Sequence, residues 1–73
     1  MSTTTATYSV TGMTCSHCVA AVTEEVSRLG GVSSVDVDLN AGGESRVTVT
    51  SSKPVPVEAI REAVDEAGYT LAS

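Results

Sequence analysis

Two cysteines three positions apart are the residues of this sequence best suited to chemistry. Cys15 and Cys18 enclose Ser16 and the chain's single histidine, His17, and Met13 lies two positions before the first cysteine. Two thiols at this spacing can close on one soft ion, and thiolates select Cu(I), zinc and iron–sulfur clusters over hard cations. Iron–sulfur clusters and structural zinc both require four ligands, which this short segment does not supply. The pair therefore favours Cu(I).

Thiol–disulfide exchange is the main chemical alternative for a C-x-x-C pair. Thioredoxin-like enzymes place this pair in a larger βαβ domain, usually beside Trp and Pro, and neither residue flanks the pair here. A thiol–disulfide oxidoreductase stays as a hypothesis from another class. A metal titration under reducing conditions, run beside an insulin-reduction assay, separates it from a metal carrier.

The position of the two thiols relative to a helix determines how they behave. We expect Cys18 in the first helical turn and Cys15 in the loop before it, because an alternating segment ending at Thr11 gives way through Gly12 to a helical pattern. Backbone N–H groups and the helix dipole favour an anion there, so the pKa of Cys18 should lie below the free-thiol value of about 8.5. A flexible loop at Cys15 would let the site open to an incoming thiolate.

Three further residues are candidates for the surroundings of the metal. Neighbouring residues at a helix start point in different directions, so we expect His17 to face solvent rather than the ion held by Cys18, with an accessory role in a copper-bridged dimer as the alternative. Met13 closes a strand and is expected to pack in the core rather than to offer its thioether. Tyr69 reaches the site only if the sheet brings the last loop beside residues 13–18.

The size and charge of the chain exclude several functions. Its 73 residues suit one domain over residues 1–73, with residues 1–4 as a flexible tail. The net charge is −5 and the four basic residues are scattered, which argues against nucleic acid and against an anionic membrane surface. The first six residues lack the features of a secretory signal, and no stretch approaches the roughly 20 apolar residues of a membrane helix. We therefore expect a cytoplasmic protein, in which thiols stay reduced.

Two segments show the three- and four-residue apolar spacing of amphipathic helices. The apolar positions are Val19, Val22, Val26 and Leu29 in the first segment, and Val57, Ile60, Val64 and Ala67 in the second. We expect the first helix to end at Gly30-Gly31 and the second at Gly68, because glycine is favoured just past a helix C-terminus. Acidic residues on both segments are expected to be solvated helix faces, with a docking surface for a basic partner as the alternative.

The remaining segments alternate apolar and polar residues, as half-buried strands do. The apolar positions are Val35, Val37 and Leu39 in one segment and Val47 and Val49 in the next. Residues 40–43 between them predict a hairpin loop, and residues 69–71 a short last strand. The order β-α-β-β-α-β predicts an α+β fold, with a four-stranded antiparallel sheet covered by two helices on one face and wet on the other.

The run Gly12-Met13-Thr14-Cys15-Ser16-His17-Cys18 resembles the GMxCxxC signature of the heavy-metal-associated domain family, which has a ferredoxin-like βαββαβ fold. Within that family the chain is most similar to the stand-alone bacterial copper chaperones of the CopZ type. The resemblance extends over nearly the whole sequence, through the valine-rich strands to Ala67-Gly68-Tyr69. It implies that Cys15 and Cys18 bind Cu(I), with Ag(I) as a mimic, in a near-linear dithiolate.

The resemblance also implies the surroundings and the destination of the ion. Met13 would lie under the loop and Tyr69 near the site, outside the ligand shell. Copper would be delivered to the cytoplasmic metal-binding domain of a copper-exporting P-type ATPase, and a copper-sensing repressor is a second recipient. Zinc- and cadmium-selective relatives tend to have Asp where this chain has Thr14, and mercury-binding periplasmic relatives usually have Pro where it has Val19. A metal-binding domain excised from such an ATPase stays as the alternative to a separate chaperone.

Overall fold

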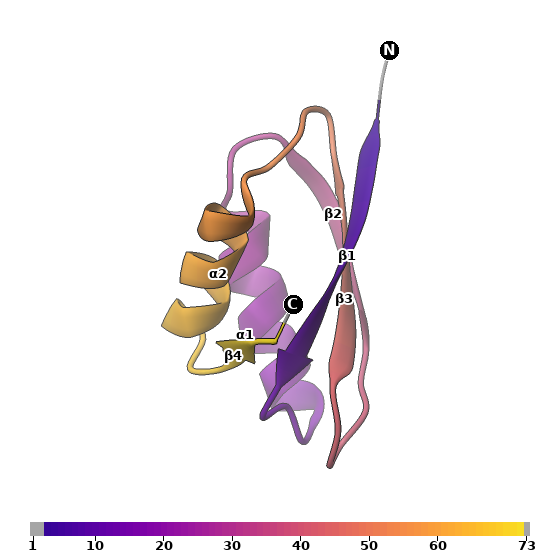
Figure 1. The fold of residues 1–73 in the computed structure, drawn as a ribbon, viewed down its shortest axis with the longest axis vertical. Helices are drawn as coiled ribbons and strands as arrows, with labels where there is room; N and C mark the ends of the chain where they lie inside the picture. The colour runs from indigo at the N-terminus through magenta and orange to yellow at the C-terminus, as the bar shows by residue number, and fades with distance from the viewer. Residues whose placement is uncertain (1–2, 73) are drawn as a thin grey trace.

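The computed structural model describes residues 3–72 and has the predicted element order. The elements are β1 (Thr4–Thr11), α1 (Ser16–Ser27), β2 (Val32–Asp38), β3 (Ser45–Ser51), α2 (Val57–Glu66) and β4 (Thr70–Leu71). The four strands form one antiparallel sheet in the order β2-β3-β1-β4. Both helices cover the same face of this sheet (Figure 1), so the predicted ferredoxin-like fold is confirmed.

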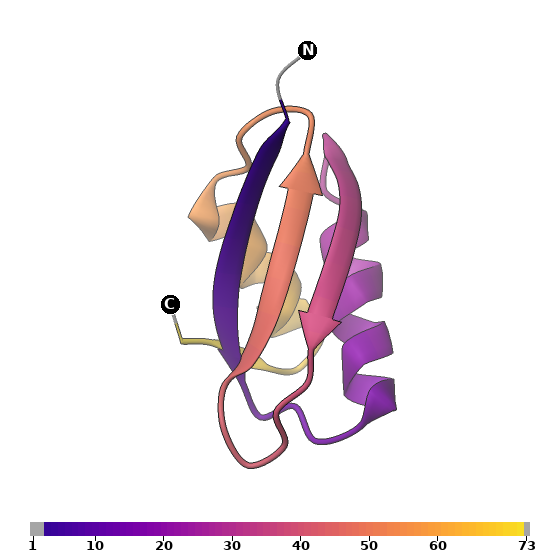
Figure 2. The ribbon, with the colours of Figure 1, turned by 90° about the vertical axis from the view of Figure 1, so that its right-hand side faces the viewer.

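The alternating strand pattern separates the two faces of the sheet. In β3, Val47 and Val49 are buried, while Arg46 is exposed and the two threonines between and after the valines are half-buried. Successive side chains of a strand point to opposite faces, so the valines face the helices and the polar residues face away from them. The uncovered face is open to view in Figure 2, with β1, β3 and β2 side by side.

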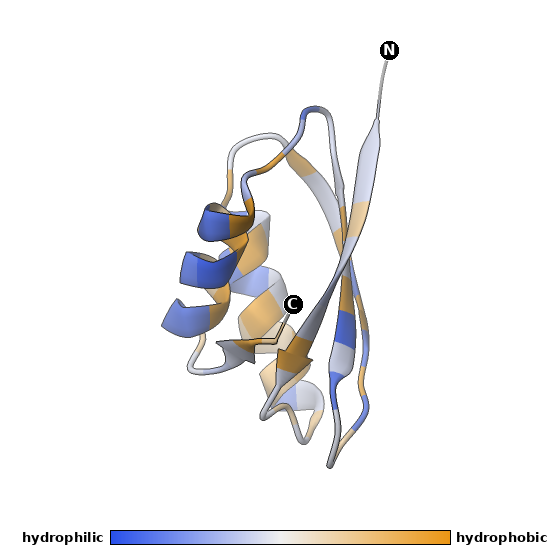
Figure 3. Ribbon diagram, in the orientation of Figure 1, coloured by the Kyte–Doolittle hydropathy of each residue, from blue (hydrophilic) through white to orange (hydrophobic). Residues whose placement is uncertain are grey.

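The core lies between the helices and the sheet. Val22 and Val26 of α1 are completely buried, as are Ile60 and Val64 of α2. Val10 at the end of β1 joins them in the same apolar cluster. Figure 3 shows the apolar stripe of α2 turned toward the sheet and its hydrophilic stripe turned outward. The predicted stripes are therefore largely confirmed. The apolar stripe of α1 determines which face of the helix packs against the sheet.

Two apolar positions were assigned wrongly. Val57 was expected in the α2 stripe, but it is the first residue of the helix and its exposed fraction is 45%. Val55, which precedes the helix, packs against the core instead, and Ala63 completes the buried face of the helix. Leu39 was expected to continue the inward face of β2, but the strand ends at Asp38 and Leu39 is exposed.

The ends of the helices differ slightly from the prediction. Helix α1 ends at Ser27, earlier than Gly30-Gly31, because Arg28 and Leu29 donate backbone hydrogen bonds to the carbonyls of Glu25 and Val26. These bonds to the third preceding residue form a tighter turn than the α-helix. Helix α2 ends at the predicted place: Ala67 is its C-cap, and Gly68 follows with φ +94.

The predicted loop between β2 and β3 is present. The backbone N–H of Gly43 donates to the carbonyl of Asn40 at 3.1 Å, and the Asn40 N–H donates to Ser45 Oγ at 2.9 Å. The second bond gives the buried Ser45 hydroxyl a partner. This hairpin tip lies at the same end of the molecule as the loop between β1 and α1 (Figure 1).

The expected flexible tail, residues 1–4, lies partly outside the described residues, which begin at residue 3. Thr4 is the first residue of β1 and pairs with Ser51 of β3. Within residues 3–72, neither helix has the length and apolar character that crossing a lipid bilayer would require.

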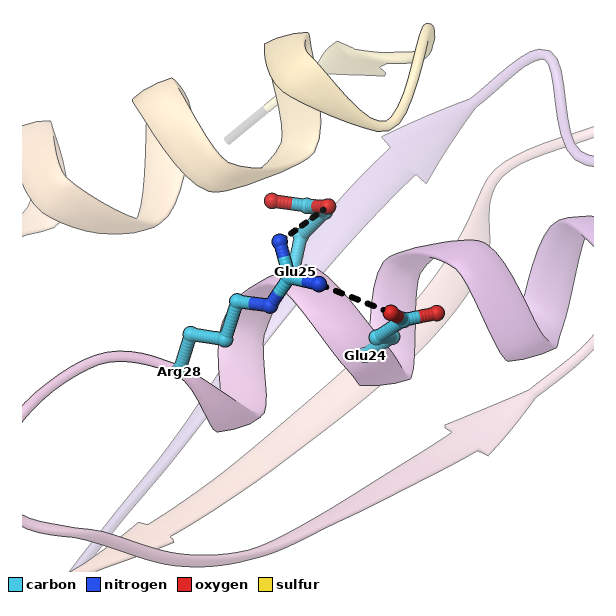
Figure 4. A network of polar contacts seen from close by, with 3 residues as sticks. All are labelled: Glu24, Glu25 and Arg28. Atoms are coloured by element: carbon cyan, nitrogen blue, oxygen red, sulfur yellow. Dashed lines mark hydrogen bonds and ion pairs between the residues drawn. The ribbon is translucent and has the colours of Figure 1, made fainter.

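Both acidic residues of α1 form ion pairs with one basic side chain, that of Arg28. Arg28 contacts Glu24 at 2.8 Å and Glu25 at 3.2 Å, one helical turn away (Figure 4). The Arg28 and Glu24 side chains are well exposed, so this network adds little to stability. Glu25 and Leu29 also line a shallow groove of about 240 Å³ against Glu62 and Ala63 of α2.

Candidate metal site

The cysteine loop, residues 12–15, connects β1 to α1 and places the two thiols differently. Gly12 has φ +91, a conformation that residues with a side chain rarely adopt, and the chain turns there out of the strand. Cys15 is the N-cap of α1 with an extended backbone, and its carbonyl accepts the N–H groups of Cys18 and Val19 at 3.0 and 3.3 Å. As predicted, Cys18 lies in the first helical turn.

The two sulfur atoms face each other at one end of the molecule. Their Sγ–Sγ distance is 3.8 Å, and both cysteines are free. A disulfide has an S–S distance of about 2.05 Å, so these are two separate thiols near enough to share one ion. Cys15 is exposed and Cys18 is buried, with an exposed fraction of 7%. The site is therefore asymmetric, with one outer and one inner sulfur.

The inner sulfur is stabilised as a thiolate. The pKa of Cys18 is lowered to about 6, chiefly because the backbone N–H of Thr14 donates to its sulfur, with the Tyr69 hydroxyl and the backbone of Cys15 as further donors. The Thr14 nitrogen lies 3.5 Å and the Thr14 hydroxyl 3.8 Å from Cys18 Sγ. Burial acts in the opposite direction but is the weaker effect. Cys18 is therefore mostly thiolate at pH 7, the form that binds metal.

Tyr69 is brought to this sulfur by the way α2 ends. Gly68 donates its N–H to the carbonyl of Asp65 at 2.9 Å, and Tyr69 donates to the carbonyl of Val64 at 3.1 Å. These two bonds form a Schellman motif, which needs the positive φ of Gly68 and fixes the direction of the next residue. The pKa of Tyr69 is raised, first by its hydrogen bond to Cys18 and then by burial. A Cβ atom added to Gly12 would lie 3.6 Å from the Tyr69 ring, so the two loops are in contact.

Of the other two candidates, Met13 is buried and His17 is exposed. Met13 is 1% exposed and belongs to the apolar cluster that also contains Cys18. His17 is exposed on the first turn of α1. In the part of the chain that the structure describes, no three His, Cys, Asp or Glu side chains gather as a metal cluster, so His17 does not join the two thiols in one chain.

Two contributions to the site were not anticipated from the sequence. The first is Thr14: the sequence bears on it only through the aspartate found there in zinc-selective relatives, yet its N–H is the principal donor to Cys18. The signal was the position of Thr14 one helical turn before Cys18, where its N–H is directed at the helix start. The second is the contact of the hairpin tip with the cysteine loop: Gly42, Gly43 and Glu44 form, with residues 11–14, the walls of an open cavity of about 330 Å³ that neither cysteine lines.

Comparison with known proteins places this geometry in a family. The model of the heavy-metal-associated domain matches residues 7–70. A COP-associated protein of Helicobacter felis is 47% identical over 62 residues, which cover 85% of this chain and 89% of that protein. The copper chaperone CopZ of Bacillus subtilis is 43% identical over 67 residues, which cover 90% of this chain and 93% of that protein.

A solved structure agrees with these sequence matches. A CopZ metallochaperone superposes with a TM-score of 0.82 at 31% identity, covering 94% of this chain and all of the other. The family match spans the cysteine loop, both helices, β2 and β3, and parts of β1 and β4. This chain therefore belongs to the heavy-metal-associated domain family.

Proposed function

We propose that this protein is a copper chaperone that binds Cu(I) between Cys15 and Cys18 and passes it to another protein without catalytic turnover. The observation that carries the proposal is the asymmetry of the two sulfurs. Cys18 is buried and held by donors from Thr14 and Tyr69, whereas Cys15 is exposed at the N-cap of α1. A carrier needs one ligand that keeps the ion and one that an incoming ligand can replace.

Transfer follows from this arrangement by ligand exchange. A thiolate of the recipient attacks the copper ion from the exposed side, and a three-coordinate ion forms while Cys18 still holds it. The bond to Cys15 then breaks, and a second recipient thiolate displaces Cys18. The ion stays bound to sulfur at every step, so no free Cu(I) is released and no electron is transferred.

The set of donors supports Cu(I) over zinc. Two thiolates satisfy a soft monovalent ion, but they leave half of the tetrahedral shell of zinc empty. Met13 is buried in the core, and His17 is exposed and forms no metal cluster with the two thiols within residues 3–72, so neither completes that shell in a single chain. Ag(I), which is also soft and monovalent, is expected to bind in the same way.

The names of the relatives, several of which are copper chaperones, support copper handling. We propose that the recipient is the metal-binding domain of a copper-exporting P-type ATPase in the cytoplasm, with a copper-sensing repressor as a second recipient. Such a domain offers its own cysteine pair, which the exchange mechanism requires. An excised domain of an ATPase would have the same site, and the difference would lie only in what is attached to it.

The thiol–disulfide oxidoreductase is the weaker candidate. A thiolate that attacks a disulfide must be reachable, and nucleophilicity falls as the pKa falls. Here the stabilised thiolate is Cys18, which is 7% exposed and lies under the loop. The exposed sulfur is Cys15, so the reactive form and the accessible position do not coincide in one residue.

Transfer in the presence of a competing chelator tests the proposal. Copper-loaded protein is mixed with a purified ATPase metal-binding domain, in an excess of a coloured Cu(I) chelator too large to enter the protein–protein contact. Ligand exchange predicts that copper reaches the domain before the chelator takes it. Capture of the copper by the chelator first, at a rate independent of the domain, would contradict direct transfer.

A further inference from the structure

The outer edge of β1 is paired over only part of its length. Strand β4 is two residues long and pairs with Val10 and Thr11. The N–H of Ala72 adds one more bond, to the carbonyl of Ser9 at 2.7 Å. Within residues 3–72, no other strand pairs with this side of β1, so among these residues the edge has no partner from Thr4 to Thr7. Figure 2 shows this part of β1 at the margin of the sheet.

The backbone groups that this edge presents can be deduced from the one bond made by Ser9. Its carbonyl points to the β4 side, and the direction of backbone groups along a strand alternates with period two. The N–H and C=O groups of Thr5 and Thr7 therefore point outward, and both of these residues are exposed. The groups of the residues between them point to β3. The edge thus offers two donors and two acceptors in a regular row.

Strand β1 contains no charged residue and no proline, the residues that commonly prevent pairing at a sheet edge. The residues of β1 are TTATYSVT, which combine strand-forming side chains with none of the features that prevent edge-to-edge pairing. The other edge of the sheet, β2, differs: it carries Asp36 and Asp38, and its pairing with β3 is irregular between Val32 and Ser34. One edge is protected against a second copy, and the other is not.

We propose that the open edge of β1 pairs with the same edge of a second copy of this chain. The strands run antiparallel about a twofold axis at Ala6. In this register Thr5 lies opposite Thr7 of the second copy, and Thr7 opposite its Thr5, so each of the two pairs exchanges two backbone hydrogen bonds. Ala6 faces its own copy in the closely spaced, non-hydrogen-bonded position, where a small side chain fits. The two four-stranded sheets become one continuous sheet.

The charge and size of this contact set its strength. The pairing strands are uncharged, but each copy has a net charge of −5, so the association should strengthen as salt screens the repulsion. Two short strands bury less than the roughly 1,600 Å² of a standard protein interface. The chain is therefore a monomer in dilute solution and pairs at high concentration.

The contact is separate from the metal site. The cysteine loop follows the C-terminal end of β1, whereas the open edge begins at its N-terminal end. Pairing along β1 therefore needs neither copper nor the thiols and leaves both sites accessible. This distinguishes it from a dimer bridged by copper through Cys15 and Cys18.

Sedimentation equilibrium of the metal-free protein tests the proposal, with reductant and chelator present, from about 10 μM to about 1 mM, where weak interfaces associate. Thr7→Pro removes the outward N–H and is tolerated at an edge, whereas Thr7→Val keeps the N–H and is the matched control. We expect association in the wild type, in Thr7→Val and in the double variant Cys15→Ser/Cys18→Ser. Thr7→Pro should associate at least about tenfold more weakly, a loss of about 1.4 kcal/mol.

Amide hydrogen exchange in the wild type gives a test that does not depend on a variant folding. The Thr5 and Thr7 amides should exchange more slowly as protein concentration rises. The Val35 and Val37 amides, which by the same alternation point outward from β2, should not change. A wild type that stays monomeric to the highest concentration overturns the proposal. So does association that disappears in the double cysteine variant, because the contact would then be at the thiols.

Discussion

The backbone N–H of Thr14 points at the sulfur of Cys18 from 3.5 Å, across the one turn of chain that separates a strand end from a helix start. This contact is the largest cause of the low pKa of Cys18. It exists because Gly12 turns the chain at φ +91 and Cys15 begins the helix, so that the N–H groups of the loop converge on one side chain. The proposed metal site therefore depends on the backbone of the loop as well as on the two thiols.

The ionisation of Cys18 should be visible in a pH titration. In Cys15→Ser, which isolates the inner thiol, ultraviolet absorbance of the thiolate should rise with a midpoint near the pKa of about 6. Because the pKa in the folded state lies below the free-thiol value of about 8.5, the unfolded chain binds more protons between these values. The free energy of unfolding of the metal-free protein should therefore rise from about pH 6 to about pH 8.5 and lose this contribution as pH falls through 6.

The matched control for that titration is the second tyrosine. Tyr69→Phe removes a donor to Cys18 and should move the midpoint upward, whereas Tyr8→Phe, on the sheet, should leave it in place. A midpoint near the free-thiol value in the parent variant would refute the stabilised thiolate.

Gly12 should be the glycine of this region least tolerant of a side chain. Gly12→Ala forces a left-handed backbone on alanine, at a cost of about 1–2 kcal/mol in the free energy of unfolding. Gly30→Ala is the control, because Gly30 does not have a positive φ and a Cβ atom there meets nothing within 4 Å. Urea denaturation of the metal-free variants measures both. Equal stability of the two variants would be inconsistent with the turn described for Gly12.

Thr14→Asp should shift metal preference toward zinc. The carboxylate adds an oxygen ligand beside the two thiolates and fills part of the tetrahedral shell that the wild type leaves empty. Competition between Zn²⁺ and Cu(I) under reducing conditions measures the change, with Thr14→Asn as a neutral control of similar size. The wild type should prefer Cu(I) strongly, and a wild type that retains Zn²⁺ in the presence of Cu(I) would show that the selectivity argument fails.

His17 should affect the copper-loaded oligomer more than the single chain. Exposed Cys15 allows two chains to share copper when no recipient is present, and His17 lies on the adjoining exposed turn. We expect His17→Ala to change copper-dependent dimerisation or exchange while the fold of the monomer is kept. Solution scattering of dilute apo and loaded protein, wild type and variant, measures this. Unchanged monomeric profiles in excess Cu(I) would remove the shared site.

The sequence predicted the frame of the site better than its details. Apolar periodicity and the C-x-x-C spacing were sufficient to place Cys18 in the first turn of α1, because those signals are local. The prediction for Val57 is wrong because periodicity does not show where a helix begins, and Val55 packs against the core instead. The approach of Tyr69 to Cys18 depends on the Schellman motif at Gly68 and on the packing of α2 against α1. The helix end at Gly68 is a local signal, but the packing of the two helices is not encoded in any local pattern. Thr14 acts through its backbone N–H, which nearly every residue type has. Its identity therefore did not indicate a contact with Cys18.

Competition for Cu(I) between this protein and a chelator of known affinity, under reducing conditions, tests the central claim most directly. The wild type should take up one Cu(I) per chain at limiting metal. Cys15→Ser and Cys18→Ser should each lose tight binding, because a single thiolate does not hold the ion, while Ser16→Ala between them should bind as the wild type does. Full affinity in either cysteine variant would contradict the two-thiolate site.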